Sequence, residues 1–349
     1  MTARCLAAAA IALPLVLACP AMAQPVGDPP PAEEGWEMPR TSWGDPDLTG
    51  MWPLDTGRTP VQRNPSYGEQ AYLTEEQYEA AREAAQTASE GYEREGEAGT
   101  IGVGHWFEYG DALRQTSLIM EPANGRIPPL TEKGEQLAAN MESSWSDDYF
   151  YDLGDFNSLD RCISRGLTAT MVPFPYNNGV EIFQSPGYVV MKIELVSDAR
   201  IIPLDGRPPI PGQIEQWMGE SRGRWEGNSL VIETTNFNGG TPMVIVGPTN
   251  QPIPTSKSMK VVERLTPVGP DRLYYEAWVE DPEVLTGPWK MQYPWIRDED
   301  YEAYEYACHE GNTTIRAYIE ATHVRFGKDP RAQLEARAAV ALAGNRSTD

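Results

Sequence analysis

Residues 221–237 read SRGRWEGNSLVIETTNF, and this stretch decides the fold class. Two runs with strand-type patterns, 222–225 and 229–235, flank the turn residues Glu226-Gly227-Asn228. Gly227 supplies the positive φ that a tight hairpin turn requires. The stretch therefore predicts an antiparallel β-hairpin.

Similar short apolar or alternating runs continue on both sides of this hairpin. The further predicted strands cover residues 180–184, 188–196, 257–265, 272–280, 289–295 and 302–308. Turn residues such as Ser185-Pro186-Gly187 separate them at spacings typical of antiparallel strands. No helical patterns alternate with the strands, which disfavours a parallel βαβ sheet. We expect a mainly β fold, a lipocalin-like antiparallel barrel of about eight strands with N- and C-terminal helices. A β-sandwich is the alternative.

One predicted strand, 272–280, shows which face lies in the core. Leu273, Tyr275, Ala277 and Val279 form its more apolar face, and Tyr274, Glu276, Trp278 and Glu280 form the other. Because successive side chains of a strand point to opposite faces, we expect the first set to be buried and the second to be solvated.

The domain organisation follows from the segments outside the strands. Residues 24–70 are predicted to form a Pro-rich extended arm, and 71–349 a single β-rich domain with peripheral helices. One helix is expected to start at Thr74, where Gln77 completes a capping box. A short helix is expected after Thr131, and a last one from Asp329 to Gly344.

Residues 1–23 have the features of a secretory signal peptide. Arg4 is followed by the apolar run 7–18, and Ala21-Met22-Ala23 fits the cleavage pattern. No other stretch approaches the roughly 18 apolar residues of a membrane helix, so we expect no transmembrane segment. The sequence predicts a soluble mature chain that is exported to the periplasm. The alternative is a lipoprotein acylated at Cys19.

Cleavage would leave Cys162 and Cys308 as the two cysteines of the mature chain. Because the periplasm is oxidising, we expect a disulfide between them. The alternative is a nucleophilic cysteine beside His309, but neighbours on a strand point to opposite faces.

Composition and missing motifs exclude several functions. The chain of 349 residues has 28 Lys and Arg against 51 Asp and Glu, a net charge of −23, which disfavours nucleic acid as a partner. The chain has three histidines and lacks the usual zinc-binding, serine-hydrolase, dinucleotide and P-loop motifs. We therefore expect no metal and no cofactor.

The hairpin stretch is also one of several longer motifs. The others are ARIIPLDGR at 199–207, YACHEGN at 306–312, DLTGMW at 47–52 and Arg161-Cys162. With these motifs the chain resembles a large family of exported, mostly uncharacterised bacterial β-rich proteins. The resemblance implies export and a β-rich fold, and carries no activity with it. That family often has a histidine after the Asp-Gly-Arg motif, where this chain has Pro208-Pro209-Ile210.

Acid–base chemistry without a cofactor is the remaining possibility for an active site. Glu194, Arg200 and His309 are the predicted catalytic residues, sharing one cavity with Arg200 near its mouth. His309 would be the general acid or base, because its ordinary pKa is near neutrality. The residues predicted to bind the substrate are Tyr176, Asn177, Asp198 and Arg224. The structural alternatives are an ion pair among Glu194, Asp198 and Arg200, and a histidine at the rim that binds only backbone.

Three functions remain open from the sequence. The first is a periplasmic, cofactor-independent lyase, isomerase or hydrolase acting on a small aromatic or terpenoid-like molecule. The second is a periplasmic carrier of a small hydrophobic ligand, and the third is an envelope interaction protein. Charged residues converging in a cavity would favour the enzyme, an apolar cavity the carrier, and a filled interior the interaction protein.

Overall fold

A computed structural model describes residues 29–327, apart from 100–107, 109, 140, 142–149, 175 and 247–250. The predicted signal peptide, Cys19, His105 and the helix predicted from Asp329 lie outside the described residues.

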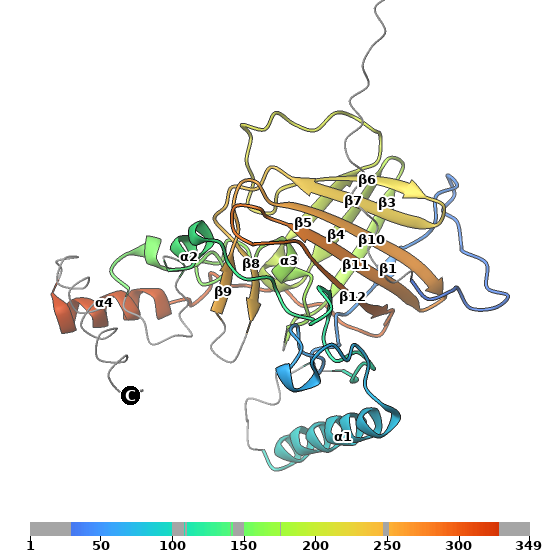
Figure 1. The fold of residues 1–349 in the computed structure, drawn as a ribbon, viewed down its shortest axis with the longest axis horizontal. Helices are drawn as coiled ribbons and strands as arrows, with labels where there is room; N and C mark the ends of the chain where they lie inside the picture. The colour runs from blue at the N-terminus through green and yellow to red at the C-terminus, as the bar shows by residue number, and fades with distance from the viewer. Residues whose placement is uncertain are drawn as a thin grey trace, which may run out of the picture.

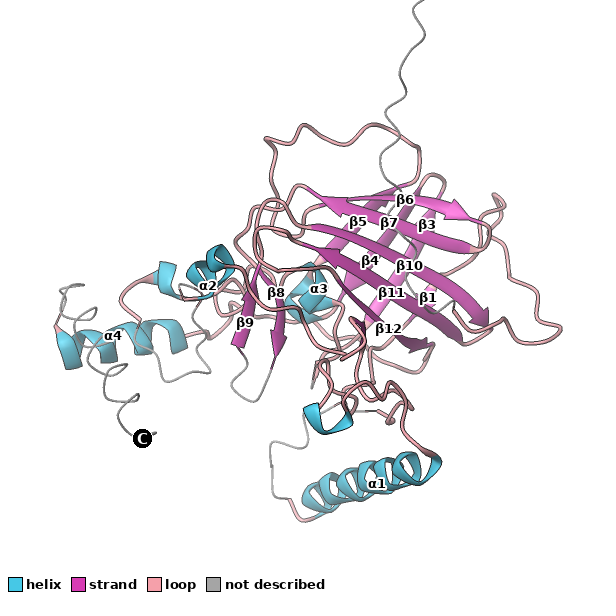
Figure 2. Ribbon diagram, in the orientation of Figure 1, coloured by secondary structure: helices cyan, strands magenta, loops and turns pink. Residues whose placement is uncertain are grey.

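The described chain is mainly antiparallel β-structure, as the hairpin patterns predict (Figures 1 and 2). A four-stranded sheet has the order β1 (Gly50–Met51), β3 (Val180–Ser185), β4 (Tyr188–Ile193), β5 (Ala199–Pro203). A six-stranded sheet has the order β2 (Ile119–Glu121), β12 (Trp289–Ile296), β11 (Arg272–Glu280), β10 (Lys260–Gly269), β7 (Ser229–Thr235), β6 (Glu220–Glu226). A small third sheet pairs β8 (Pro242–Val246) with β9 (Gln251–Pro254).

The helices lie around the sheets (Figure 2). They are α1 (Glu75–Glu97), α2 (Glu132–Ala138), α3 (Leu167–Thr170) and α4 (Thr314–Phe326), with 3-10 turns η1 (Pro65–Tyr67), η3 (Leu153–Asp155) and η4 (Leu195–Ser197). The predicted capping box of α1 is present, because Gln77 N donates to Thr74 Oγ1 and Thr74 N donates to Gln77 Oε1. The strand predicted at 302–308 is wrong. That segment is irregular and leads through a turn into α4.

The two larger sheets face each other and bury one hydrophobic core (Figure 1). The four-stranded sheet contributes Ile182, Val189, Met191 and Ile202, and the six-stranded sheet contributes Leu230, Ile232, Val261, Leu265, Leu273, Tyr275, Ala277 and Val279. Strand pairing in the described residues gives three separate sheets and does not close them into a ring.

The predicted core face of β11 is confirmed, whereas its other face is only partly solvated. Glu276 is buried and forms an ion pair with the buried Lys290 of β12, with 2.8 Å between Nζ and Oε1. Lys290 Nζ also lies 4.8 Å from the ring centre of Trp278. The Glu276 carboxylate can be buried because Lys290 on the adjacent strand neutralises it. The pattern of residues within β11 alone does not reveal this partner.

Part of the predicted arm belongs to the core. Leu48, Trp52 and Leu54 are buried, and β1 pairs with β3. Trp52 N donates to Val180 O, and Leu54 N donates to Asn178 O, so the chain continues along the edge of the four-stranded sheet after β1. Residues 48–54 are therefore a structural part of the domain rather than an arm.

The predicted disulfide is present between Cys162 and Cys308, whose Cα atoms are 5.6 Å apart. It joins two segments that are separated by 146 positions in the sequence. Within the described ranges, no helix has the length and apolar character needed to cross a membrane.

Candidate functional site

Arg200 lies in the core between the two large sheets. Its guanidinium forms a bidentate ion pair with Glu263 of β10, in which Nη1 donates to Oε1 over 3.0 Å and Nη2 donates to Oε2. Tyr275 Oη donates to Glu263 Oε1, and Arg200 Nη2 donates to Ser221 Oγ. Arg200 is therefore not at the mouth of a cavity. Position 200 has the same parity as the buried Ile202, which places it on the inner face of β5.

The other predicted residues are dispersed. Asp198 accepts a hydrogen bond from Ser164 Oγ, and burial raises the pKa of its carboxyl. Arg224 is exposed and pairs with Glu226, and Tyr176 packs edge to face against Phe174. The three-way ion pair of Glu194, Asp198 and Arg200, considered as an alternative, is absent among the described contacts.

His309 is exposed and lines a pocket beside α4, whereas Glu194 lines a different one. The two predicted catalytic residues therefore do not face one cavity. The prediction depended on a strand at 302–308. Because that segment is irregular, His309 lies on the outer surface.

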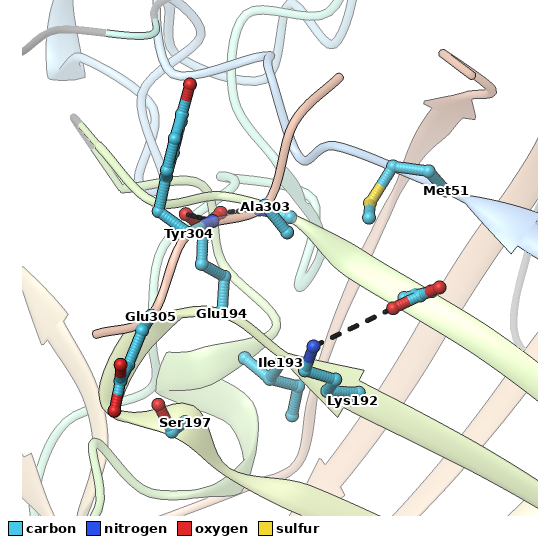
Figure 3. A pocket seen from close by; sticks show the side chains of 10 residues that line it. Met51, Lys192, Ile193, Glu194, Ser197, Ala303, Tyr304 and Glu305 are labelled. Atoms are coloured by element: carbon cyan, nitrogen blue, oxygen red, sulfur yellow. Dashed lines mark hydrogen bonds and ion pairs between the residues drawn. The ribbon is translucent and has the colours of Figure 1, made fainter. Parts of the chain in front are cut away.

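Glu194 is the predicted residue that the structure surrounds with other polar groups (Figure 3). It is 3% exposed and follows the last residue of β4. Its carboxylate accepts hydrogen bonds from Asn177 Nδ2 (2.8 Å), Gly179 N (3.2 Å), Tyr301 Oη (2.7 Å) and Tyr304 N (2.9 Å). Glu194 and Asn177, which the sequence predicts separately as a catalytic and a substrate-binding residue, are therefore in direct contact. Beside them is a pocket of about 200 Å³ that also contains Lys192 and Ser197.

The backbone around Glu194 is strained. Asn177, Val196 and Ser197 have positive φ values of 54°, 63° and 54°. A β-branched residue such as Val196 rarely adopts this conformation, which costs about 1–3 kcal/mol per residue. Strain of this kind is concentrated at functional sites, where the surrounding structure maintains it.

Tyr301 connects Glu194 to a second carboxylate. Its hydroxyl lies 2.7 Å from Glu194 Oε2 and 3.0 Å from Glu108 Oε2. Burial and the two carboxylates raise the pKa of Tyr301 far above its usual value, so the phenol keeps its proton at neutral pH. With one proton to donate, it serves one carboxylate at a time.

Asp55 completes this acidic group. Burial raises the pKa of Asp55 to about 7, with further contributions from the carboxylates of Glu108, Asp298 and Glu194. Its Oδ1 atom is buried and has no hydrogen-bond partner in the described structure. The carboxyl of Asp55 therefore changes its protonation state near neutral pH.

Asp55 lines a pocket of about 600 Å³, which we call the Asp55 pocket. Thr56 lines it too, is 7% exposed, and has a buried Oγ1 without a partner among the described residues. The remaining walls combine apolar and polar side chains, chiefly Pro53, Tyr78, Leu113, Arg272, Tyr274, Pro294 and Asp298. The pocket is formed where the start of β11 and the end of β12 meet residues 53–56 and α1, which lies below β12 in Figure 1.

Arg272 is the cation of this pocket. It is exposed and has no ion pair within the part of the chain that the structure describes. Its guanidinium is therefore available to a carboxylate or an oxyanion, unlike that of Arg200. No group of three or more His, Cys, Asp or Glu in the described ranges is suited to holding a metal ion.

Sequence reasoning missed Asp55, Thr56, Glu108 and Tyr301. Asp55 and Thr56 fall within the segment predicted as an arm, although they lie just beyond the DLTGMW motif at 47–52. Their closeness to that motif is the signal that could have found them. Tyr301 gives no such indication, because only the fold brings it to Glu194.

Comparisons of the chain with protein-family models, curated proteins and solved structures give no match. We therefore infer the function from the geometry of the pockets.

Proposed function

We propose that the protein is a cofactor-independent enzyme of the lyase, isomerase or hydrolase class, acting by acid–base chemistry on a small aromatic or terpenoid-like molecule in the Asp55 pocket. One observation carries the proposal. Two adjacent residues, Asp55 and Thr56, line this pocket, and each has a buried side-chain oxygen with no hydrogen-bond partner in the described structure. Unpartnered buried polar atoms cost free energy. We propose that rotation of the two side chains toward the pocket lets a bound substrate offset this cost by supplying the missing partners.

Asp55 is the proposed general acid or base. A group that titrates near the working pH is present in both protonation states, so it can accept a proton and return it. The pKa of Asp55, raised to about 7 by burial and by the nearby carboxylates, meets this condition. This role replaces the one predicted for His309.

Thr56 and Arg272 are the proposed substrate-binding groups. The Thr56 hydroxyl can donate to a substrate oxygen, and the Arg272 guanidinium can stabilise a carboxylate or a developing oxyanion. The aromatic rings of Tyr78 and Tyr274 offer flat surfaces to a ring-shaped substrate, and Pro294 adds apolar surface. A volume of about 600 Å³ is in the usual range for small-molecule sites.

Glu194 is proposed as a positioning residue. It holds Tyr301, which contacts Glu108, and the charges of Glu194 and Glu108 help to keep the pKa of Asp55 high. Glu194 therefore acts on the site through its neighbours without touching the substrate.

Export to the periplasm and a relation to lipocalin-like barrels are parts of the same proposal. The Cys162–Cys308 disulfide supports an oxidising compartment. For the barrel, the support is the close approach of β5 and β6, the edge strands of the two large sheets. A Cβ atom at Gly223 would lie 2.6 Å from Leu204 Cδ2 and 2.8 Å from Ile202 Cγ2.

The test starts from protein recovered from its native periplasm, with mass spectrometry of the small molecules that co-purify. These molecules are then incubated with the protein in D₂O, and deuterium incorporation and product formation are followed by NMR. We expect turnover, and a loss of about 10²- to 10⁴-fold in D55N, which keeps the shape of the side chain but cannot titrate.

The matched control is D205N, which removes an exposed carboxylate on the loop after β5, outside the Asp55 pocket. It should retain the wild-type rate. A D55N protein as active as wild type would overturn the proposal. Bound ligand that is released unchanged, without exchange, would favour the carrier.

A further inference from the structure

A second pocket, of about 490 Å³, lies where α4 meets the disulfide. We call it the disulfide pocket. Its cationic or polar side chains are Arg161, His309, Asn312 and Arg316, and its apolar side chains are Leu153, Ile315 and Ile319. It shares no residue with the Asp55 pocket.

The disulfide builds this pocket. Arg161 precedes Cys162 and His309 follows Cys308, so the bond between the two cysteines brings both side chains to one cavity. Asn312 Nδ2 strengthens the junction by donating to Asp160 O over 3.3 Å, and it lies 3.5 Å from Cys162 Sγ.

The charge of the pocket is opposite to that of the protein. The chain carries 51 acidic residues and a net charge of −23, yet none of the described residues that line this cavity has a carboxylate. Arg161 has no ion pair in the described ranges, and its Nε atom is buried without a hydrogen-bond partner. Its guanidinium lies 5.9 Å from the ring centre of Trp217, which orients it without neutralising it.

Arg316 adds a second positive charge, and its one ion pair among the described residues is with Glu320, at 3.5 Å on the exposed side of α4. On the same helix, Ile315 and Ile319 are four residues apart, so they form one apolar strip along the pocket. Leu153 of η3, which is 60% exposed, also lines the pocket and extends this apolar surface beyond α4.

We propose that the disulfide pocket binds a small amphiphilic anion, a monocarboxylate with a medium-length apolar chain. Its carboxylate contacts Arg161, with His309 and Arg316 close by, and its chain lies on Ile315, Ile319 and Leu153. An uncompensated guanidinium beside an apolar strip matches both ends of such a ligand. This proposal is independent of the reaction assigned to the Asp55 pocket.

The test is calorimetric titration of the full mature protein with octanoate, acetate and 1-octanol. Octanoate should bind saturably with one site per chain. Acetate lacks the chain and octanol lacks the charge, so both should bind at least about tenfold more weakly. Octanol binding as tight as octanoate, or no saturable octanoate binding, would overturn the proposal.

Two substitutions separate this site from general charge effects. R161Q should weaken octanoate binding about tenfold or more, because it removes the unpaired guanidinium. R82Q removes an exposed arginine of α1 and should leave the affinity unchanged. If R161Q binds octanoate as wild type does, or if both variants lose affinity equally, the assignment is wrong.

Reduction of the disulfide gives an independent readout in the unmodified sequence. Opening the bond removes the covalent link between the segments that carry Arg161 and His309. Octanoate affinity should therefore fall after treatment with a reductant, while circular dichroism verifies that the sheets persist. A reduced, folded protein with unchanged octanoate affinity would contradict the role of the disulfide in building the site.

Discussion

Asp55 is the residue whose protonation links the site to the stability of the protein. Its pKa rises from 3.8 to about 7 on folding, mainly through burial. The folded protein therefore holds this proton more tightly than the unfolded chain does. The contribution is favourable to folding at acidic pH and is lost as the pH rises from about 4 to about 7.

D55N should remove this pH dependence. Relative to wild type, the variant should gain stability between pH 5 and pH 8, by roughly 2 kcal/mol once partial solvent exposure is allowed for. Urea unfolding of both proteins at the two pH values measures the difference. A difference that stays constant with pH would show that Asp55 titrates normally.

Tyr301 offers a second prediction for a single residue. Removing its hydroxyl in Y301F leaves Glu194 Oε2 without one of its donors, and should lower the free energy of unfolding by about 1–3 kcal/mol. The control is Y304F, because Tyr304 is 67% exposed and its hydroxyl bonds, within the described part of the chain, to the exposed Glu302 alone. Urea unfolding at pH 7 should show little change in Y304F, and equal losses in the two variants would refute a special role for Tyr301.

Between elements, the ion pair of Arg200 and Glu263 joins β5 of one large sheet to β10 of the other. Both side chains are almost fully buried. R200M leaves Glu263 as an uncompensated buried carboxylate and should lower the free energy of unfolding by about 3–5 kcal/mol.

The double variant R200M/E263Q separates the loss of the ion pair from the loss of the packing of either side chain. Removing the charge of Glu263 should recover part of the stability lost in R200M, because the penalty comes from the unpaired charge. Urea unfolding of wild type, both single variants and the double variant gives the coupling. Strictly additive losses would mean that the two strands are not coupled through this pair.

Over the whole molecule, the Cys162–Cys308 bond links the segment before α3 to the segment before α4. A cross-link between positions 146 apart restricts the unfolded chain strongly. The double variant C162S/C308S should therefore lose about 2–5 kcal/mol of stability in urea unfolding.

Intact-mass measurement provides the chemical control for this prediction. Neither Cys162 nor Cys308 should be alkylated in the native protein without a reductant, and both should be alkylated with one. Two thiols that react freely in the native protein would contradict the bond.

The sequence by itself determined the local features of this protein. Gly227 marks the turn between β6 and β7, and the alternation from Leu273 to Val279 identifies the core face of β11. The two cysteines that follow the predicted signal peptide predict their own pairing. The turn and the core face depend on residues that are close in the sequence, and the cysteine pairing depends on the number of cysteines. Local periodicity and composition are therefore sufficient to predict all three features.

Only the tertiary structure decided which side chains meet. Nothing in the sequence near Glu194 indicates Tyr301, more than 100 residues away, and nothing near Arg200 indicates Glu263 on the other sheet. The arrangement of Asp55 and Thr56 against β11 and β12 likewise depends on how the chain after β1 runs along the edge of the four-stranded sheet. A site is formed by convergence of distant segments, and convergence depends on long-range packing that local patterns do not encode.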